Sequence, residues 1–139
     1  QKVMASYCKS YAGKFNVVIC LNDNEAFGAI DAMKAAGVSY GVDGDVIGSS
    51  FDACTAGLQK VLDKEINADF QCNPLQGPDC LKIIQALQGG QTVEKQTFME
   101  EPWFVSEDVL KDISYKNNSG KDVTEPLIVV DKATVDEAY

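Results

Sequence analysis

The chain has 139 residues, of which 45% are hydrophobic and 24% charged, the composition of one ordinary globular domain rather than of a disordered segment. Its 12 basic and 21 acidic side chains leave a formal charge of −9, which disfavours binding to nucleic acid or to an anionic membrane. It contains no histidine, so the composition argues against most enzymes and most transition-metal sites. We therefore expect a neutral small-molecule ligand, with no cofactor, no metal and no catalytic residue.

The first part of the chain predicts a regular alternation of strands and helices. Strands are predicted over residues 15–21, 46–51 and 66–72. Helices are predicted over residues 2–11, from Asn22 to Gly37, and over 53–64 and 79–88. The strand at 15–21 is continuously apolar, which is typical of a strand buried on both faces. Repeated strand–helix–strand units predict an α/β fold with a parallel sheet.

Beyond Gly90 the alternation is less regular. Helix 79–88, just before this point, would turn Leu81, Ile84 and Leu87 inward. The remaining elements are predicted as a strand over 93–99, a helix over 106–113, a polar loop over 115–124 and a last strand over 127–130. The longest apolar stretch, residues 17–21, is far shorter than the roughly 18 residues that a transmembrane helix needs.

The five cysteines have no spacing that suits a zinc site and no CxxC pair. We interpret Cys20, in an apolar run, and Cys54, on a predicted helix face, as small buried hydrophobic residues. Cys72 and Cys80 flank a predicted turn. They either pair in an oxidising compartment or remain free thiols.

Polar residues lie at the carboxyl ends of the first three predicted strands. They are Asn22 with Asp23, then Asp52, and then Gln71, Cys72 and Asn73. Ligands of open parallel sheets bind beyond the carboxyl ends of the strands, and carboxylate and amide groups suit the hydroxyls of a carbohydrate. The alternative is that these residues only cap the following helices, as Asn and Asp often do.

Other motifs carry less information. Trp103 and Phe104 could stack on a sugar ring or pack against the body of the domain. The sequence contains no nucleotide-binding glycine motif and no GxSxG nucleophile motif.

Three segments together resemble the periplasmic sugar-binding proteins of the ribose and galactose type, which serve bacterial ABC transporters. They are VVICLNDNEAFGAIDAMKAAG, VIGSSFDA and KEINADFQCNPLQGP, in this order and with matching spacing. The CNPLQGP form is similar to the branch that contains the galactofuranose receptor. The resemblance covers residues 14–130.

The resemblance implies a type I fold of two lobes that close on one monosaccharide. Each lobe would be a parallel sheet with helices on both faces, in three layers. It implies that Asn22 and Asp52 contact sugar hydroxyls, and that Asp23 either contacts the sugar or caps the helix. The third contact of the family falls on Gln71, Cys72 or Asn73. A cysteine at position 72 departs from the Gln or Asn that is usual there.

The resemblance also assigns the chain to the C-terminal part of such a protein. Residues 1–72 would form the C-terminal lobe, and residues 73–139 the hinge crossing and the terminal segment. We expect such a part alone to bind sugar weakly or not at all, and to self-associate through exposed apolar surface. The implied location is the periplasm or the outer face of the cell membrane, and the implied partner is a membrane permease.

Two alternatives share the same fold. One is the sugar-sensing effector domain of a LacI-type transcription regulator, and the other is the sensor portion of a signalling receptor. Fold alone does not decide between such functions.

Overall fold

The computed structural model describes residues 1–97, 99, 101–106, 112–117 and 119–139. The strands are β1 (Val17–Ile19), β2 (Ile47–Asp52), β3 (Ala68–Gln71), β4 (Trp103–Val105), β5 (Asp112–Lys116) and β6 (Asp122–Val129). The helices are α1 (Lys2–Ser10), α2 (Asp23–Ala35), α3 (Thr55–Leu62), α4 (Gly77–Gln88) and α5 (Lys132–Glu137). The alternation predicted for the first part of the chain is confirmed, with β1 and β3 shorter than predicted.

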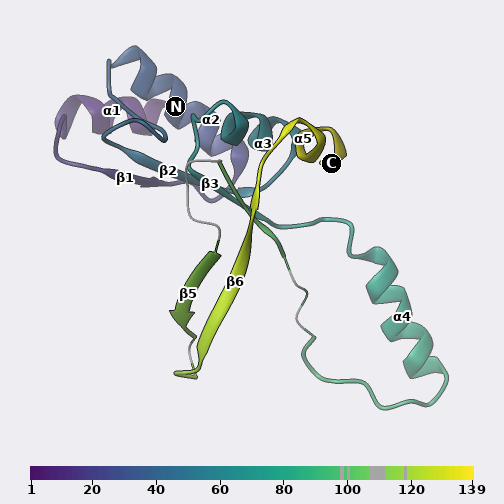
Figure 1. Ribbon diagram of the computed structural model, residues 1–139. Helices are drawn as coiled ribbons and strands as arrows, with labels where there is room; N and C mark the ends of the chain where they lie inside the picture. The colour runs from purple at the N-terminus through teal and green to yellow at the C-terminus, as the bar shows by residue number, and fades with distance from the viewer. Residues whose placement is uncertain (98, 100, 107–111, 118) are drawn as a thin grey trace.

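These strands form one sheet in the order β1-β2-β3-β4-β6-β5 (Figure 1). Strands β1, β2 and β3 are parallel, as right-handed strand–helix–strand units require. Strand β4 runs antiparallel to β3, while β6 is parallel to β4 and antiparallel to β5. The α/β class is thus confirmed, with a mixed sheet in place of an entirely parallel one.

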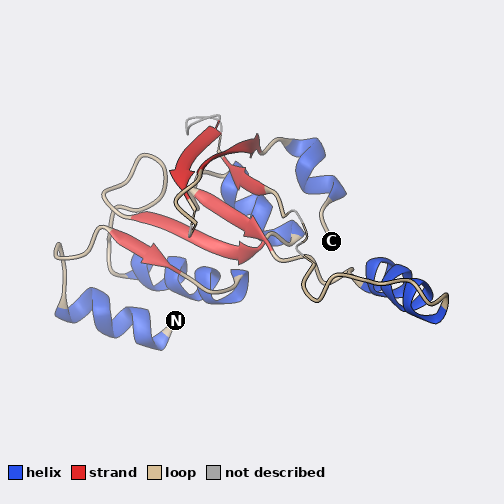
Figure 2. Cartoon of the chain, turned by 90° about the horizontal axis from the view of Figure 1, so that it is seen from below, coloured by secondary structure: helices blue, strands red, loops and turns tan. Residues whose placement is uncertain are grey.

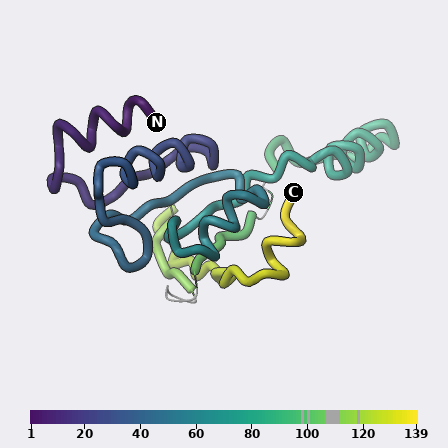
Figure 3. Tube along the Cα trace, turned by 90° about the horizontal axis from the view of Figure 1, so that it is seen from above, coloured from purple at the N-terminus to yellow at the C-terminus, as the bar shows by residue number. Residues whose placement is uncertain are grey.

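Helices α1, α2, α3 and α5 lie on one face of the sheet (Figures 1 and 3). The side chain of Asn22 accepts a hydrogen bond from the backbone N–H of Glu25 and so caps α2. The core side of α2 consists of small and apolar residues: Ala26, Ala29, Ile30, Ala32 and Met33 are buried. Gly37 ends the helix with a φ of 68°, which glycine adopts at little cost.

The opposite face of the sheet is uncovered in the described part of the chain (Figure 2). Val17 of β1 is 50% exposed, Ile19 is 65% exposed, and Ile47 of β2 is 52% exposed. The apolar run at 15–21 predicted burial on both faces, but only the helix-covered face is buried here. The exposed apolar surface expected from the resemblance is present.

Helix α4 extends away from the sheet and the other helices (Figures 1 and 3). None of its residues is buried, and Leu81, Ile84 and Leu87 are 53%, 50% and 55% exposed. The prediction that these three side chains point into a core is therefore wrong for this chain. Their spacing correctly indicated one apolar helix face, but periodicity does not say whether a partner element lies against that face.

The second part of the chain differs most from expectation. Residues 93–97 and 99 form no strand, and the predicted helix at 106–113 falls mainly on residues 107–111, outside the described residues. The polar loop expected at 115–124 lies mostly in the hairpin of β5 and β6, and the last strand begins at 122 instead of 127. All five residues of β5 are exposed. Ile113 and Tyr115 alternate with polar residues in β5, a short strand signal that the prediction overlooked.

The cysteines divide by burial. Cys20 is buried as predicted, and Cys54 is half-buried just before α3. Cys72 and Cys80 are exposed free thiols. Of the two alternatives for these cysteines, the structure therefore shows free thiols and no disulfide between them. Among the described helices, none combines the length and the apolar character needed to cross a bilayer.

Candidate functional site

The carboxyl ends of β1, β2 and β3 lie along one edge of the sheet, because the three strands are parallel. Asp52 is the last residue of β2 and pairs in register with Gln71, the last residue of β3. Asn22 begins α2 just after β1. The structure therefore brings together the three polar strand ends predicted from the sequence.

Asn22 and Asp23 have different roles, and Asp23 is not the cap of α2. The cap of α2 is Asn22, whose Oδ1 accepts the Glu25 N–H at 2.8 Å. Asp23 is only 2% exposed, and its carboxylate accepts hydrogen bonds from Ser50 Oγ at 2.6 Å and from the Cys54 N–H at 3.0 Å. Asp23 thus joins the turn after β1 to β2 and to the turn after β2.

Asp52 and Ala53 have an unusual backbone. Their φ angles are 114° and 56°, a region that residues other than glycine seldom occupy. Each such residue costs on the order of 1–3 kcal/mol, and such conformations concentrate at functional sites. No hydrogen bond from the described residues reaches the Asp52 carboxylate, whose two oxygens are therefore free to accept hydroxyl groups.

Tyr139 supports this turn, and sequence reasoning missed it. Its hydroxyl donates to the Asp52 carbonyl oxygen at 2.6 Å and lies 3.1 Å from the Cys72 carbonyl oxygen. The Cys72 N–H also approaches the Asp52 carbonyl, at 3.4 Å. Burial, with a contribution from Asp52, raises the pKa of Tyr139 to about 12. A contact between residues 87 positions apart leaves no local signal in the sequence.

The change Tyr139→Phe is expected to lower the free energy of unfolding by about 1 kcal/mol, because it removes one hydrogen bond to a strained turn. Urea denaturation measures this difference. Tyr7→Phe, the same change at a 52% exposed tyrosine of α1, is the control and should have little effect. Equal effects of the two changes would contradict this role of the Tyr139 hydroxyl.

Gln71, Cys72 and Asn73 complete the row at the end of β3. Asn73 Oδ1 accepts the Leu75 N–H at 2.7 Å, so its amide NH2 remains available as a donor. Gln71 and Asn73 line a cavity of about 380 Å³ that Tyr139 also borders. Gln71 and Cys72 border a second, open hollow of about 800 Å³ beside α4. Both spaces exceed what a single water molecule needs.

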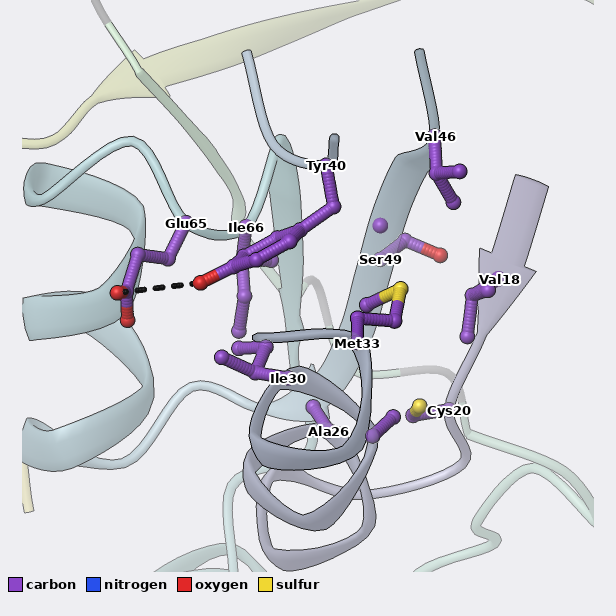
Figure 4. Close-up of a pocket in the computed structure, with 12 residues that line it drawn as sticks. Val18, Cys20, Ala26, Ile30, Met33, Tyr40, Val46, Ser49, Glu65 and Ile66 are labelled. Atoms are coloured by element: carbon purple, nitrogen blue, oxygen red, sulfur yellow. Dashed lines mark hydrogen bonds between the residues drawn. The ribbon is translucent and has the colours of Figure 1, made fainter. Parts of the chain in front are cut away.

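The space between α2 and the sheet is core packing and not a ligand site (Figure 4). Its free volume is about 10 Å³, at the lower limit for one water molecule. Ala26, Ile30 and Met33 of α2 line it, and the Tyr40 hydroxyl donates to Glu65 Oε1 at 3.4 Å.

The aromatic candidates pack within the sheet. Phe104 is buried, and the ring of Trp103 contacts Phe70 edge to face with centroids 5.0 Å apart. Trp103 also stacks on Tyr115 at 6.1 Å. Of the two alternatives for Trp103 and Phe104, the structure shows packing against the body of the domain.

The fold is similar to part of a lobe of the type I periplasmic sugar-binding proteins. This confirms the resemblance seen in the sequence. No family model matches the chain.

Particular relatives support the same class. The chain is 27% identical over 123 residues to the galactofuranose-binding protein YtfQ of Escherichia coli (strain K12), covering 86% of the chain and 38% of that protein. A Mycobacterium smegmatis protein solved in complex with β-D-fucofuranose is 30% identical, with a TM-score of 0.64 over 75% of the chain and 33% of that protein. The periplasmic binding protein of the arabinose ABC transporter from Shewanella sp. ANA-3, bound to α- and β-L-arabinofuranose, is 25% identical, with a TM-score of 0.64 over 75% of the chain and 34% of that protein. The chain thus spans 33–38% of the length of these relatives.

Proposed function

We propose that this chain is part of a solute receptor that captures a monosaccharide outside the cytoplasm and delivers it to the membrane permease of an ABC transporter. The observation that carries this proposal is the arrangement of Asn22, Asp52 and Gln71 at one edge of the sheet, at the ends of three parallel strands. The proposed location is the periplasm or the outer face of the cell membrane. The relative from Shewanella sp. ANA-3 belongs to an ABC transporter, which supports transport over gene regulation.

Each side chain would have a distinct part in holding the sugar. The Asp52 carboxylate accepts hydrogen bonds from two neighbouring hydroxyls, and such charge-assisted bonds contribute about 1.5–3 kcal/mol each. The Oδ1 atoms of Asn22 and Asn73 are engaged by backbone N–H groups, so both residues would use their NH2 groups as donors to the sugar. Gln71 and Cys72 would border the same ligand. Binding, without chemical conversion, is the proposed activity.

Furanose sugars are the first candidates for the ligand, because the relatives named above are described with galactofuranose, fucofuranose and arabinofuranose. We further propose that residues 1–72 act as the C-terminal lobe and residues 73–139 as the hinge crossing and terminal segment. Residues 103–139 also supply strands β4–β6 and helix α5, so this segment would be anchored to the lobe that it leaves.

The direct test is a titration of the isotopically labelled chain with L-arabinose and with methyl β-D-galactofuranoside, followed by amide chemical shifts. Because the chain spans about a third of the length of its relatives, we expect weak, millimolar binding. The saturable shifts should concentrate at Asn22, Asp52 and Asn73. Saturable shifts confined to another surface would contradict the proposed site.

The change Asp52→Asn should weaken sugar binding by about tenfold or more, because it replaces charge-assisted hydrogen bonds by neutral ones. The same titration measures the loss. Asp43→Asn, at an exposed aspartate in a turn remote from these strand ends, removes the same charge and should leave the affinity unchanged. Equal losses in the two variants would assign the effect to net charge instead of to the site.

A further inference from the structure

Two buried carboxyl groups meet beneath the proposed site. Asp23 at the start of α2 is 2% exposed, and Asp69 in the middle of β3 is fully buried. A Cβ atom added to Gly57 of α3 would lie 2.3 Å from Asp23 Oδ2 and 2.6 Å from Asp69 Oδ2. The two carboxyl oxygens therefore border the same point, directly below the glycine.

The two groups have unequal partners. Asp23 accepts hydrogen bonds from Ser50 and from the Cys54 N–H, and it lies in the first turn of a helix, where a negative charge is favoured. Neither oxygen of Asp69 has a hydrogen-bond partner of normal geometry. A buried ionised carboxylate without a donor is costly, and Asp69 would face a second carboxylate as well.

A single proton between the two carboxyl groups removes the repulsion between their charges. If Asp69 is protonated, it can donate to the Asp23 carboxylate, and the pair then carries one charge in place of two. Burial, and then the charge of Asp23, raise the pKa of Asp69 from 3.8 to about 8, while the backbone N–H groups of Ala53 and Phe70 offset part of this rise.

Among the described residues, no surrounding group supplies an alternative counter-charge to Asp69. On β2 and β4, the residues in register with Asp69 are Ser50 and Phe104, and α3 contributes Gly57. The other titratable groups that interact with Asp23 are the thiol of Cys54 and the hydroxyl of Tyr139. Among the described residues, the charged group that acts most on Asp69 is thus Asp23 itself.

We propose that Asp23 and Asp69 share one proton in the folded protein, and that this pair positions the turns after β1 and β2 for sugar binding. The shared proton ties β3 to Asp23, which in turn holds the Cys54 N–H next to the strained Asp52–Ala53 turn. Asn22 precedes Asp23 directly. The positioning role rests on the proposed function, whereas the shared proton does not depend on it.

Carboxyl carbon shifts of Asp69 in the labelled wild-type protein, followed against pH without sugar, test the shared proton directly. We expect Asp69 to titrate near pH 8, and the amide shift of Cys54 to change with the same midpoint. A titration of Asp69 below about pH 5, in the range usual for carboxyl groups, would overturn the proposal.

Thermal unfolding gives an independent measurement. The folded state binds the Asp69 proton more tightly than the unfolded state, so this group's contribution to stability is complete below pH 4 and is lost as the pH rises towards 8. We expect the Tm of the wild type to fall by about 5 °C or more between pH 5 and pH 8. In Asp69→Asn the amide donates to Asp23 at every pH, so that fall should be largely absent.

Asp31→Asn is the matched control, because it removes one acidic group from an exposed position of α2. Its Tm should follow the wild-type dependence on pH. Equal pH profiles for Asp69→Asn and the wild type would contradict the shared proton even if both proteins bind sugar. Failure of sugar binding with the expected pH profile would instead contradict only the proposed function.

Discussion

Replacing Gly57 by alanine is expected to lower the free energy of unfolding by about 3 kcal/mol, at the upper end of the usual cost of overpacking. The added methyl group would lie 2.3 Å from Asp23 Oδ2 and 2.6 Å from Asp69 Oδ2, closer than atoms can approach. Alanine normally favours a helix over glycine by about 1 kcal/mol, so a loss of stability would show that the contact with the carboxyl pair dominates. Urea denaturation measures the change.

Gly77→Ala is the matched control for this substitution. Gly77 begins α4, and an added Cβ there meets no atom within 4 Å. The control should be neutral or slightly stabilising, because helix propensity is then the main effect. If Gly57→Ala were equally harmless, the close packing of α3 over Asp23 and Asp69 would be incorrect.

A second pair of changes compares two helical leucines. Leu58→Ala should cost about 3 kcal/mol, because Leu58 is 1% exposed and its truncation leaves a cavity in the core between α3 and the sheet. Leu81→Ala removes the same atoms from α4, where the side chain is 53% exposed, and should cost less than about 0.5 kcal/mol. Urea denaturation of both variants decides whether α4 contributes to the core of this chain.

A large loss in Leu81→Ala would show that α4 packs against something in solution. A stability that rises with protein concentration would then identify the partner as a second copy of the chain. This outcome would support the self-association expected from the exposed apolar surface. A small loss in Leu58→Ala would contradict the placement of the core between α3 and the sheet.

Much of the site could be predicted because its signals are local. Asn22 follows one strand, and Asp52 and Gln71 are the last residues of two others. The three strands are parallel, and parallel strands end at one edge of a sheet. The division of work between Asn22 and Asp23 was not predictable, because both residue types can cap a helix. Only the packing of α2 against β2 decided that Asn22 is the cap and that Asp23 turns inward to Ser50.

The sequence by itself determined the α/β class and the order of the first three strands and helices, because period and capping are properties of neighbouring residues. The tertiary structure alone decided the reversed strand β4, the exposure of α4 and the contact of Tyr139 with Asp52. It also decided the meeting of Asp23 with Asp69, whose carboxyl groups lie on separate elements. These features depend on contacts between distant residues, and no local pattern specifies which distant surfaces meet.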